Sequence, residues 1–355
     1  MKTFNVSDLR SLYRTYGYSK YKMSKFEEYD LYVRNKSFLI SDNIITFTDT
    51  DGKLMALKPD VTLSIVKNCK GDAGLHKVYY DESVYRISNH AYKEIRQIGL
   101  ECMGDIDGYV ICETLMLAIK SLEAISGDFV LDVSHMGIVS DIMDSLAVSD
   151  EGREKLLSAI GEKNTHGIRA VCKDEGVDED GARVLCALAT TYGEADKVAD
   201  KLSTLIKSEK LTELKNILSL LSDKRVRIDF SVVNDMNYYN GIVFKGFINR
   251  VPASVLSGGQ YDKLMEKMGK KSGAIGFALY PDLLEELYSN PARYDVDAVL
   301  LYDENTDIAE LRQAVEKLTG DGYSISVQRS LPEKLRYKKL LKFTEGEVKT
   351  LEDNA

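Results

Sequence analysis

The sequence predicts an α+β fold in which helices flank an antiparallel sheet. Strand-like segments are joined mainly by hairpins and long excursions instead of regular βαβ units. Such connections favour an antiparallel sheet with the helices gathered against it. Residues 149–221 show successive helical patterns and no strand pattern, and strands resume after them. We therefore interpret this block as a helical insertion within a β-rich domain.

Length and composition narrow the class of protein. With 355 residues, the chain is long enough for two or three domains. Apolar residues make up 44% and charged residues 29% of it, as in ordinary soluble globular proteins. No apolar run is long enough to cross a bilayer, and the N-terminus has no signal-peptide core, so we expect a cytoplasmic protein without membrane contact. The net charge of −9 disfavours a large nucleic-acid surface.

The cysteines and histidines do not form a metal-binding pattern. The five cysteines are scattered without a C-x-x-C pair and are expected to be reduced thiols. The four histidines lie far apart, and none pairs with Cys or Glu at a metal-ligand spacing. We expect neither a metal site nor a cofactor.

Two short motifs mark the structure near the N-terminus. Residues 45–57 alternate apolar and polar side chains about Asp51-Gly52, which is the strongest short-range signal of a hairpin. Pro59 and Asp60 precede apolar residues at helical spacing. They predict a helix with the proline in its first turn.

The remaining elements are predicted from hydrophobic periodicity. Residues 76–87 read as two strands separated by a turn at Asp81-Glu82-Ser83. Helices are expected at 7–21, 108–125 and after Pro281, strands at 94–104, 225–233 and 242–248, and a strand followed by a helix within 128–146 and 253–269.

These elements group into three parts. We expect a core formed by 1–148 and 222–290, the helical insertion at 149–221, and a small C-terminal βαβ module at 293–355. The continuous apolar run at 296–302 is typical of a parallel strand.

Two polar groups are candidates for a binding site. Asp60 and Thr62 lie two residues apart at the predicted helix start, where they could grip an ammonium group, although the same pair fits ordinary helix-start chemistry. Strand alternation places Gln97, Gly99 and Glu101 on one face. They indicate either a polar pocket or a solvent-facing edge.

Two further motifs carry weaker signals. Gly258 and Gly259 are expected to form a turn between a strand and a helix, which could cradle an anion or be a turn alone. Tyr238 and Tyr239 are adjacent, so one should face the core and the other the opposite side of the sheet. No nucleophile–base or paired-carboxylate set has a convincing spacing, so the residues alone predict a polar, tyrosine-lined pocket for an unidentified ligand.

Four segments in a fixed order resemble the catalytic domain of class II aminoacyl-tRNA synthetases, specifically the histidyl-tRNA synthetase branch. Residues 57–67 are similar to that family's LRPEGT segment, and residues 84–104 resemble its motif 2 with a shortened loop. Residues 232–247 are similar to VRGLDYYTGTVFE, and 256–264 to AGGRYDGL. The resemblance implies the synthetase-like sheet and a C-terminal module that is a truncated anticodon-binding domain.

The resemblance also implies a histidine-binding site. Asp60, Thr62 and Gln97 occupy the positions that hold the α-amino group of histidine. Glu101 and Tyr239 stand where the imidazole ring is recognised.

Three more residues complete the implied set. Arg86 matches the motif 2 arginine, which contacts the ATP α-phosphate and the amino-acid carboxylate. Tyr261 lies in the second histidine signature, and Tyr238 precedes the ring-reading tyrosine. The likeness runs from about residue 9 to about residue 287.

The chain lacks two arginines that the synthetase pattern has. Asn234 stands where the family has the arginine that stabilises the adenylation transition state, and Leu283 replaces the motif 3 arginine. Ser24 stands at the motif 1 proline. Losing one cation from a phosphoryl-transfer site can cost about 10³-fold or more in rate, so adenylation is not expected.

These departures favour a non-catalytic relative, the regulatory subunit family of ATP phosphoribosyltransferase, which acts in the first step of histidine biosynthesis. Residues 130–143 are more similar to that family's LDLGHVG segment than to the synthetases. The resemblance implies a short-form catalytic subunit as partner, a homodimeric core, L-histidine as effector and no tRNA. The alternatives are a divergent histidyl-tRNA synthetase and a stand-alone amino-acid-binding protein with another partner.

Overall fold

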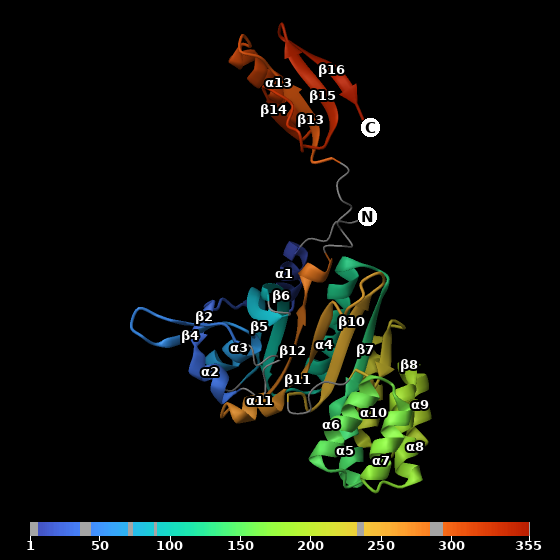
Figure 1. The fold of residues 1–355 in the computed structure, drawn as a ribbon. Helices are drawn as coiled ribbons and strands as arrows, with labels where there is room; N and C mark the ends of the chain where they lie inside the picture. Colours follow the sequence, from blue (N-terminus) through green and yellow to red (C-terminus); the bar gives the residue numbers. More distant parts are fainter. Residues whose placement is uncertain are drawn as a thin grey trace. The chain divides into compact units, whose positions relative to one another are not determined.

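The computed structural model describes residues 6–35, 44–69, 74–88, 91–232, 238–284 and 294–354. The chain forms two compact units, Met1–Glu285 and Glu286–Ala355 (Figure 1). Among the described residues, no helix is long and apolar enough to cross a membrane.

A nine-stranded sheet forms the centre of the first unit (Figure 1). Its strands are β1 (Ser19–Lys20), β5 (His76–Ser88), β6 (Ala91–Gly104), β7 (Phe129–His135), β8 (Tyr192–Glu194), β9 (Val226–Asp229), β10 (Ile242–Ile248), β11 (Leu256–Gln260) and β12 (Gly273–Leu279). They lie in the order β1-β5-β6-β12-β11-β10-β7-β9-β8.

The centre of this sheet is antiparallel, as predicted, but two pairs nearer its margins are parallel. β1 pairs with β5 and β7 pairs with β9 in parallel, whereas the neighbours from β5 to β7 in the sheet order are antiparallel. Parallel neighbours need a long crossover connection. The long excursions that join β1 to β5 and β7 to β9 provide it.

The predicted turn at Asp81-Glu82-Ser83 is wrong, because β5 runs through these residues without interruption. The polar side chains have partners along the strand. Asp81 accepts hydrogen bonds from Arg96, and Glu82 pairs with the buried Lys58 at 3.1 Å. A polar tripeptide typical of a turn is therefore held in a strand by cations that come from elsewhere in the chain.

Helices pack against the sheet or connect its strands. The Ile111, Leu115, Ala118 and Leu122 stripe of the predicted helix 108–125 is buried, as expected. A Cβ at Gly246 of β10 would lie 2.8 Å from Leu122, so this glycine permits the close approach of that helix. The helices of the core are α1 (Val6–Thr15), α2 (Tyr29–Arg34), α3 (Thr62–Asn68), α4 (Gly108–Ile125), α5 (Met136–Ser145), α11 (Asp262–Lys267) and the 3₁₀ helix η2 (Pro281–Leu284).

Several boundaries differ from the prediction. The first helix ends at Thr15 instead of residue 21, and Gly17 has the positive φ that turns the chain toward β1. The hairpin about Asp51-Gly52 is confirmed as β3 (Thr46–Thr48) and β4 (Leu54–Leu57), which pair in an antiparallel manner. β4 also pairs with β2 (Phe26–Glu28), which completes a small three-stranded sheet.

The block between β7 and β9 is helical, as predicted, except for β8. Its helices are α6 (Asp150–Gly161), α7 (Thr165–Asp174), α8 (Glu179–Thr190), α9 (Ala195–Ser203) and α10 (Glu209–Leu221). The prediction of no strand in this block is wrong, because β8 pairs with β9 and attaches the insertion to the edge of the sheet. A three-residue strand is too short to give a clear alternation in the sequence.

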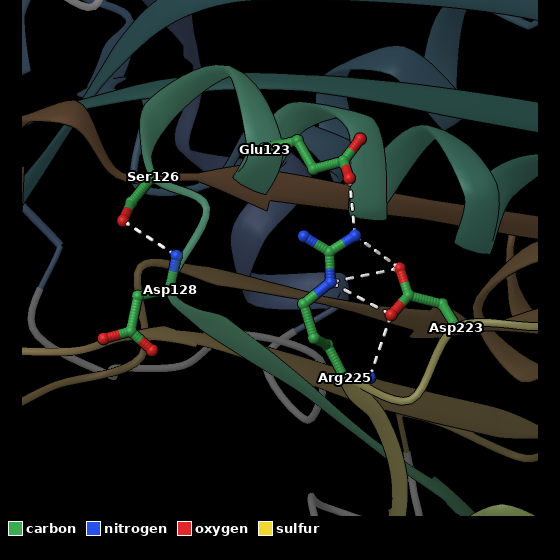
Figure 2. A network of polar contacts seen from close by, with 5 residues as sticks. All are labelled: Glu123, Ser126, Asp128, Asp223 and Arg225. Carbon is green, nitrogen blue, oxygen red and sulfur yellow. Dashed lines mark hydrogen bonds and ion pairs between the residues drawn. The ribbon is translucent and has the colours of Figure 1, made fainter. Parts of the chain in front are cut away.

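An ion-pair network marks the return of the chain from the insertion (Figure 2). Arg225, just before β9, pairs with Asp223 and with Glu123 of α4. Its guanidinium also lies over the Phe129 ring, 4.2 Å from the ring centroid. Beside it, Ser126 accepts a hydrogen bond from the Asp128 backbone at the start of β7. The network ties α4, β7 and β9 together where the chain re-enters the sheet.

The second unit contains a four-stranded sheet in the order β14-β13-β15-β16. The predicted parallel strand is confirmed, since β13 pairs in parallel with β14 and β15. The hairpin of β15 and β16 extends the predicted βαβ pattern. Its elements are β13 (Val296–Leu301), α13 (Ile308–Gly320), β14 (Ile325–Gln328), β15 (Tyr337–Thr344) and β16 (Glu347–Asp353).

Candidate functional site

A cavity of about 850 Å³ lies on the first unit, over the strands at the centre of the sheet. All eight residues predicted to bind a ligand line it: Asp60, Thr62, Arg86, Gln97, Glu101, Tyr238, Tyr239 and Tyr261. Leu283, at the position of a synthetase arginine, lines it as well. Asn234 lies outside the described residues. Segments far apart in the sequence therefore converge on one pocket.

The start of α3 presents the first two residues. The Asp60 carboxylate accepts a hydrogen bond from the Leu63 backbone N–H at 2.8 Å, so it caps the helix. Because α3 begins at Thr62, Pro59 precedes the helix and does not lie in its first turn as predicted. Asp60 is buried, and burial raises its pKa above the ordinary range of an aspartate. The helix-start role and the cavity-lining role thus coexist in one residue.

Glu101 of β6 is the most enclosed acid of the cavity, with 2% of its surface exposed. Its Oε1 accepts a hydrogen bond from the Thr62 hydroxyl at 2.9 Å, and its Oε2 accepts one from the Tyr261 hydroxyl at 2.6 Å. Gly276 of β12 lies directly opposite. A Cβ at Gly276 would be 1.8 Å from Glu101 Oε2, so only glycine leaves room for the carboxylate here.

The electrostatics of Glu101 follow from this enclosure. Burial raises its pKa to about 8, and the hydrogen bonds from Tyr261 and Thr62 offset only part of that effect. The nearby Asp60 raises the pKa further. Near neutral pH these surroundings therefore favour a protonated Glu101, and a ligand that brings a cation or an N–H donor would stabilise its charged form.

Three tyrosines form one wall of the cavity. The ring centroids of Tyr238 and Tyr239 are 4.5 Å apart, and those of Tyr238 and Tyr261 are 5.9 Å apart. The expectation that the adjacent tyrosines face opposite sides is wrong, since both line the cavity. They precede β10, so strand alternation does not apply to them.

The Gly258-Gly259 turn is also wrong, because both glycines lie inside β11. They are needed for space. A Cβ at Gly259 would lie 2.7 Å from the Tyr239 ring, and one at Gly258 would lie 2.3 Å from the Gly276 carbonyl oxygen. The pair lets the tyrosine wall and β12 approach β11 closely.

Arg86 of β5 and Gln97 of β6 line the cavity from two neighbouring strands. The Arg86 Nε donates a hydrogen bond to the Pro59 carbonyl at 3.0 Å, while its Nη2 is buried and has no hydrogen-bond partner among the described residues. Gln97 lies on the same face of β6 as Glu101, as predicted, and is 4% exposed. The buried guanidinium nitrogen favours a ligand with a carboxylate or phosphate oxygen.

Sequence reasoning missed two residues that shape the site, Tyr80 and Asn240. Tyr80 of β5 lines the cavity, and its hydroxyl lies where a Cβ at position 99 would be, so Gly99 makes room for it. Asn240 donates to the Asp262 carboxylate at 2.9 Å and accepts from the Asp262 backbone N–H at 3.0 Å. These two contacts join the tyrosine segment to the start of α11. The AGGRYDGL-like motif contains Asp262, but nothing local identifies Asn240 as its partner.

The arrangement is suited to binding a small amphoteric ligand. It offers two buried carboxylates, a guanidinium and aromatic walls in one cavity. Within the described part of the chain, no group of three or more His, Cys, Asp or Glu side chains could hold a metal ion.

Comparison with known proteins identifies the family. The model of the histidyl-tRNA synthetase family matches residues 5–284. An ATP phosphoribosyltransferase regulatory subunit from Oceanobacillus iheyensis is 25% identical over 315 residues, which cover 84% of this chain and 78% of that protein.

Solved structures agree with this match. A structure described as an ATP phosphoribosyltransferase regulatory subunit/histidyl-tRNA synthetase from Bacillus halodurans has a TM-score of 0.74 and 25% identity, covering 91% of this chain and 86% of that one. A chain of the ATP phosphoribosyl transferase (HisG:HisZ) complex from Thermotoga maritima has the same fold, with a TM-score of 0.63, 20% identity and coverage of 79% and 97%. The chain belongs to the histidyl-tRNA synthetase family.

Proposed function

We propose that this protein is a regulatory subunit of ATP phosphoribosyltransferase, acts in histidine biosynthesis and is not itself a catalyst. Relatives that carry this name are similar to it over most of both chains. The observation that carries the proposal is the mixed state of the cavity: the residues that would recognise histidine are assembled, whereas Leu283 lines the cavity at the position of a synthetase arginine.

The regulatory ligand of this proposal is L-histidine. Asp60 would pair with the ammonium group, and Thr62 and Gln97 would add hydrogen bonds. Glu101 would accept from a ring N–H and favour the protonated ring, because a nearby carboxylate stabilises the imidazolium. An aliphatic side chain would leave Glu101 buried without a ligand partner, which costs about 1–3 kcal/mol or more.

The carboxylate of histidine would meet Arg86. Its Nη2 is buried and free of partners among the described residues, so it can serve a ligand oxygen. The synthetase pattern has a second arginine at the position of Asn234. With that cation replaced, histidine affinity is expected to be modest until the catalytic subunit closes the site.

The partner assignment is tested by reconstitution. The chain is expressed with and without a short-form ATP phosphoribosyltransferase catalytic subunit, and phosphoribosyl transfer to ATP is measured. Activity and co-elution of a larger hetero-oligomer are expected only when both subunits are present. An unchanged catalytic rate and separate elution would refute the proposal.

The second candidate function is that of a divergent histidyl-tRNA synthetase, which is consistent with the match to that family. Histidine-dependent ATP–pyrophosphate exchange separates the two, because only a synthetase forms the adenylate. We expect exchange at background level. A clear signal would favour the synthetase over the regulatory subunit.

A homodimeric core is part of the proposal. A two-fold dimer uses one self-complementary patch and is the commonest arrangement of soluble oligomers. Phe26 and Phe47 of the small three-stranded sheet stack edge to face and are both exposed, which supplies apolar surface for such a contact. Light scattering at micromolar concentration should give a dimer mass, and a monomer mass would contradict this part of the proposal.

A further inference from the structure

The two edges of the C-terminal sheet differ in how they are protected against pairing with another strand. β16 is one edge of this sheet, and β14 is the other. Four of the seven residues of β16 are charged, and its pairing with β15 shifts register between Leu340 and Leu341. Charged side chains and irregular pairing are the devices that keep an open strand edge from recruiting a further strand. The β16 edge is therefore protected.

The β14 edge has neither device. Its residues, Ile325–Gln328, include no charged side chain and no proline, and its pairing with β13 is regular. Among the described residues, no strand pairs with its outer side. The apolar side chains of α13 pack in one cluster with those of β13, β14 and β15, so this helix covers a face of the sheet and leaves the edge clear.

The register fixes which backbone groups this edge presents. The Ala298 N–H of β13 donates a hydrogen bond to the Ser324 carbonyl at 3.0 Å, in line with the parallel pairing of β13 and β14. Successive residues of a strand point their backbone groups to alternate sides. Those of Ser326 therefore also face β13, whereas the N–H and C=O groups of Ile325 and Val327 face outward. Two donors and two acceptors remain for another strand.

This edge is complementary to itself. In an antiparallel pair of two copies centred on Ser326, Ile325 of each copy would lie opposite Val327 of the other, and the two residues would exchange both hydrogen bonds. Within residues 321–331 the charged side chains are Asp321 and Arg329. The same pairing makes Asp321 of one copy a diagonal neighbour of Arg329 of the other. It therefore joins opposite charges and brings no like charges together.

We propose that β14 is a docking edge for a second copy of this chain, so that two C-terminal units join into one continuous sheet. A two-fold contact needs one self-complementary patch, which this edge provides. Because β14 is short, the contact should be weaker than the core contact and should form only above micromolar concentrations. This inference goes beyond the proposed function and requires neither histidine nor the catalytic subunit.

Disulfide cross-linking at the centre of the pairing tests the contact directly. In Ser326→Cys the two copies would place their Cα atoms ~4.5 Å apart, within the ~4.4–6.8 Å span of a disulfide. Ser324→Cys is the matched control on the same strand, because its two copies would be offset along the strands by roughly 13 Å. Under mild oxidation of the full chain, we expect a several-fold higher yield of linked dimer from Ser326→Cys than from Ser324→Cys. The wild type, with its five cysteines, gives the background.

Charge substitutions at Ser326 give an independent test. Strand alternation places Ser326 on the face opposite Ile325 and Val327, which pack in the α13 cluster, so Ser326→Glu and Ser326→Lys should both fold. Sedimentation equilibrium of the full chain well above micromolar concentration measures association. Each variant alone should weaken it roughly tenfold or more, because like charges then meet at the centre of the contact. An equimolar mixture of the two should restore it, because opposite charges then meet.

Three results would each overturn the proposal. They are equal cross-linking of Ser326→Cys and Ser324→Cys, association of Ser326→Glu as tight as that of the wild type, and a mixture that associates no better than either charged variant alone. A strand of another protein at this edge would also give no cross-link between copies. None of these results depends on phosphoribosyltransferase activation or on the core contact, so this proposal and the proposed function can fail separately.

Discussion

Glu101 and Lys245 project from the same face of one sheet, yet their surroundings are opposite. Glu101 is almost fully enclosed and has a hydroxyl donor on each carboxylate oxygen. Lys245 is half-buried and has no carboxylate partner among the described residues. The position of the Glu101 carboxylate is therefore fixed by hydrogen bonds within the protein. Lys245 is not held in this way, and the following experiments test how far the enclosure of Glu101 determines the behaviour of the cavity.

The largest effect is expected from filling the space opposite Glu101. In Gly276→Ala the new Cβ would lie 1.8 Å from Glu101 Oε2 and 2.4 Å from the Leu100 carbonyl oxygen, and the backbone oxygen cannot move aside cheaply. We expect the free energy of unfolding to fall by about 1–3 kcal/mol or more, with loss of histidine binding. Chemical denaturation and calorimetry measure the two quantities. Gly108→Ala is the control, because nothing lies within 4 Å of its Cβ, and it should be neutral or slightly stabilising.

The next effect concerns the charge of Glu101. Glu101→Gln keeps the shape but cannot become negative, so histidine affinity should fall by about tenfold or more, since a hydrogen bond to a charged group contributes about 1.5–3 kcal/mol. Glu101→Ala should cost at least as much. Calorimetry on the complex with the catalytic subunit gives the affinities. If both variants bind histidine as tightly as wild type, the effector binds elsewhere.

A smaller effect is expected in the pH dependence of stability. Because the pKa of Glu101 is raised from its ordinary value to about 8, the folded protein binds a proton that the unfolded chain releases. The stabilisation from this proton is present at low pH and is lost as the pH rises through about 8. Relative to Glu101→Gln, the wild type should therefore lose stability between about pH 5 and about pH 9. Denaturation curves of both proteins across this range measure the difference, and parallel curves would contradict the raised pKa.

The smallest effect is expected at the support of the tyrosine wall. Asn240→Ala removes both hydrogen bonds to Asp262 and should lower the free energy of unfolding by about 1 kcal/mol and histidine affinity a few-fold. The matched control is Asn249→Ala, which removes an exposed hydrogen bond to Asp128 at 2.8 Å between two residues that do not line the cavity. Equal affinities in the two variants would show that the Asn240 contact does not position the wall.

The sequence predicted the members of the site better than their arrangement. Asp60, Glu101 and Tyr261 were identified through motifs, and all of them line the cavity. The hydrogen bonds from the Thr62 and Tyr261 hydroxyls to Glu101 connect three distant segments, and no local pattern encodes such contacts. Asn240 was not identified for the same reason, since β10 and β11 separate it in the sequence from its partner Asp262.

The errors in the fold prediction have a common physical cause. The Asp81-Glu82-Ser83 and Gly258-Gly259 segments have the composition of turns but lie within strands. The first is held by Arg96 and Lys58, and the second is required by close approach of other chain segments. Tertiary contacts override local preference in both cases, whereas elements with long periodic patterns, such as α4, were predicted to the residue.

The order of strands in the sheet has a consequence for synthesis of the chain. β12, β11 and β10 lie between β6 and β7, although all three follow both of them in the sequence, after the helical insertion. One edge of β6 must wait for β12, and one edge of β7 must wait for β10. At the ribosomal rate of ~5–20 residues per second, these edges stay unpaired for roughly 7–30 s. Unpaired strand edges are templates for aggregation. The nascent protein should therefore depend on chaperones during this interval. The cavity cannot be complete before the interval ends, because β10, β11 and β12 supply part of its lining.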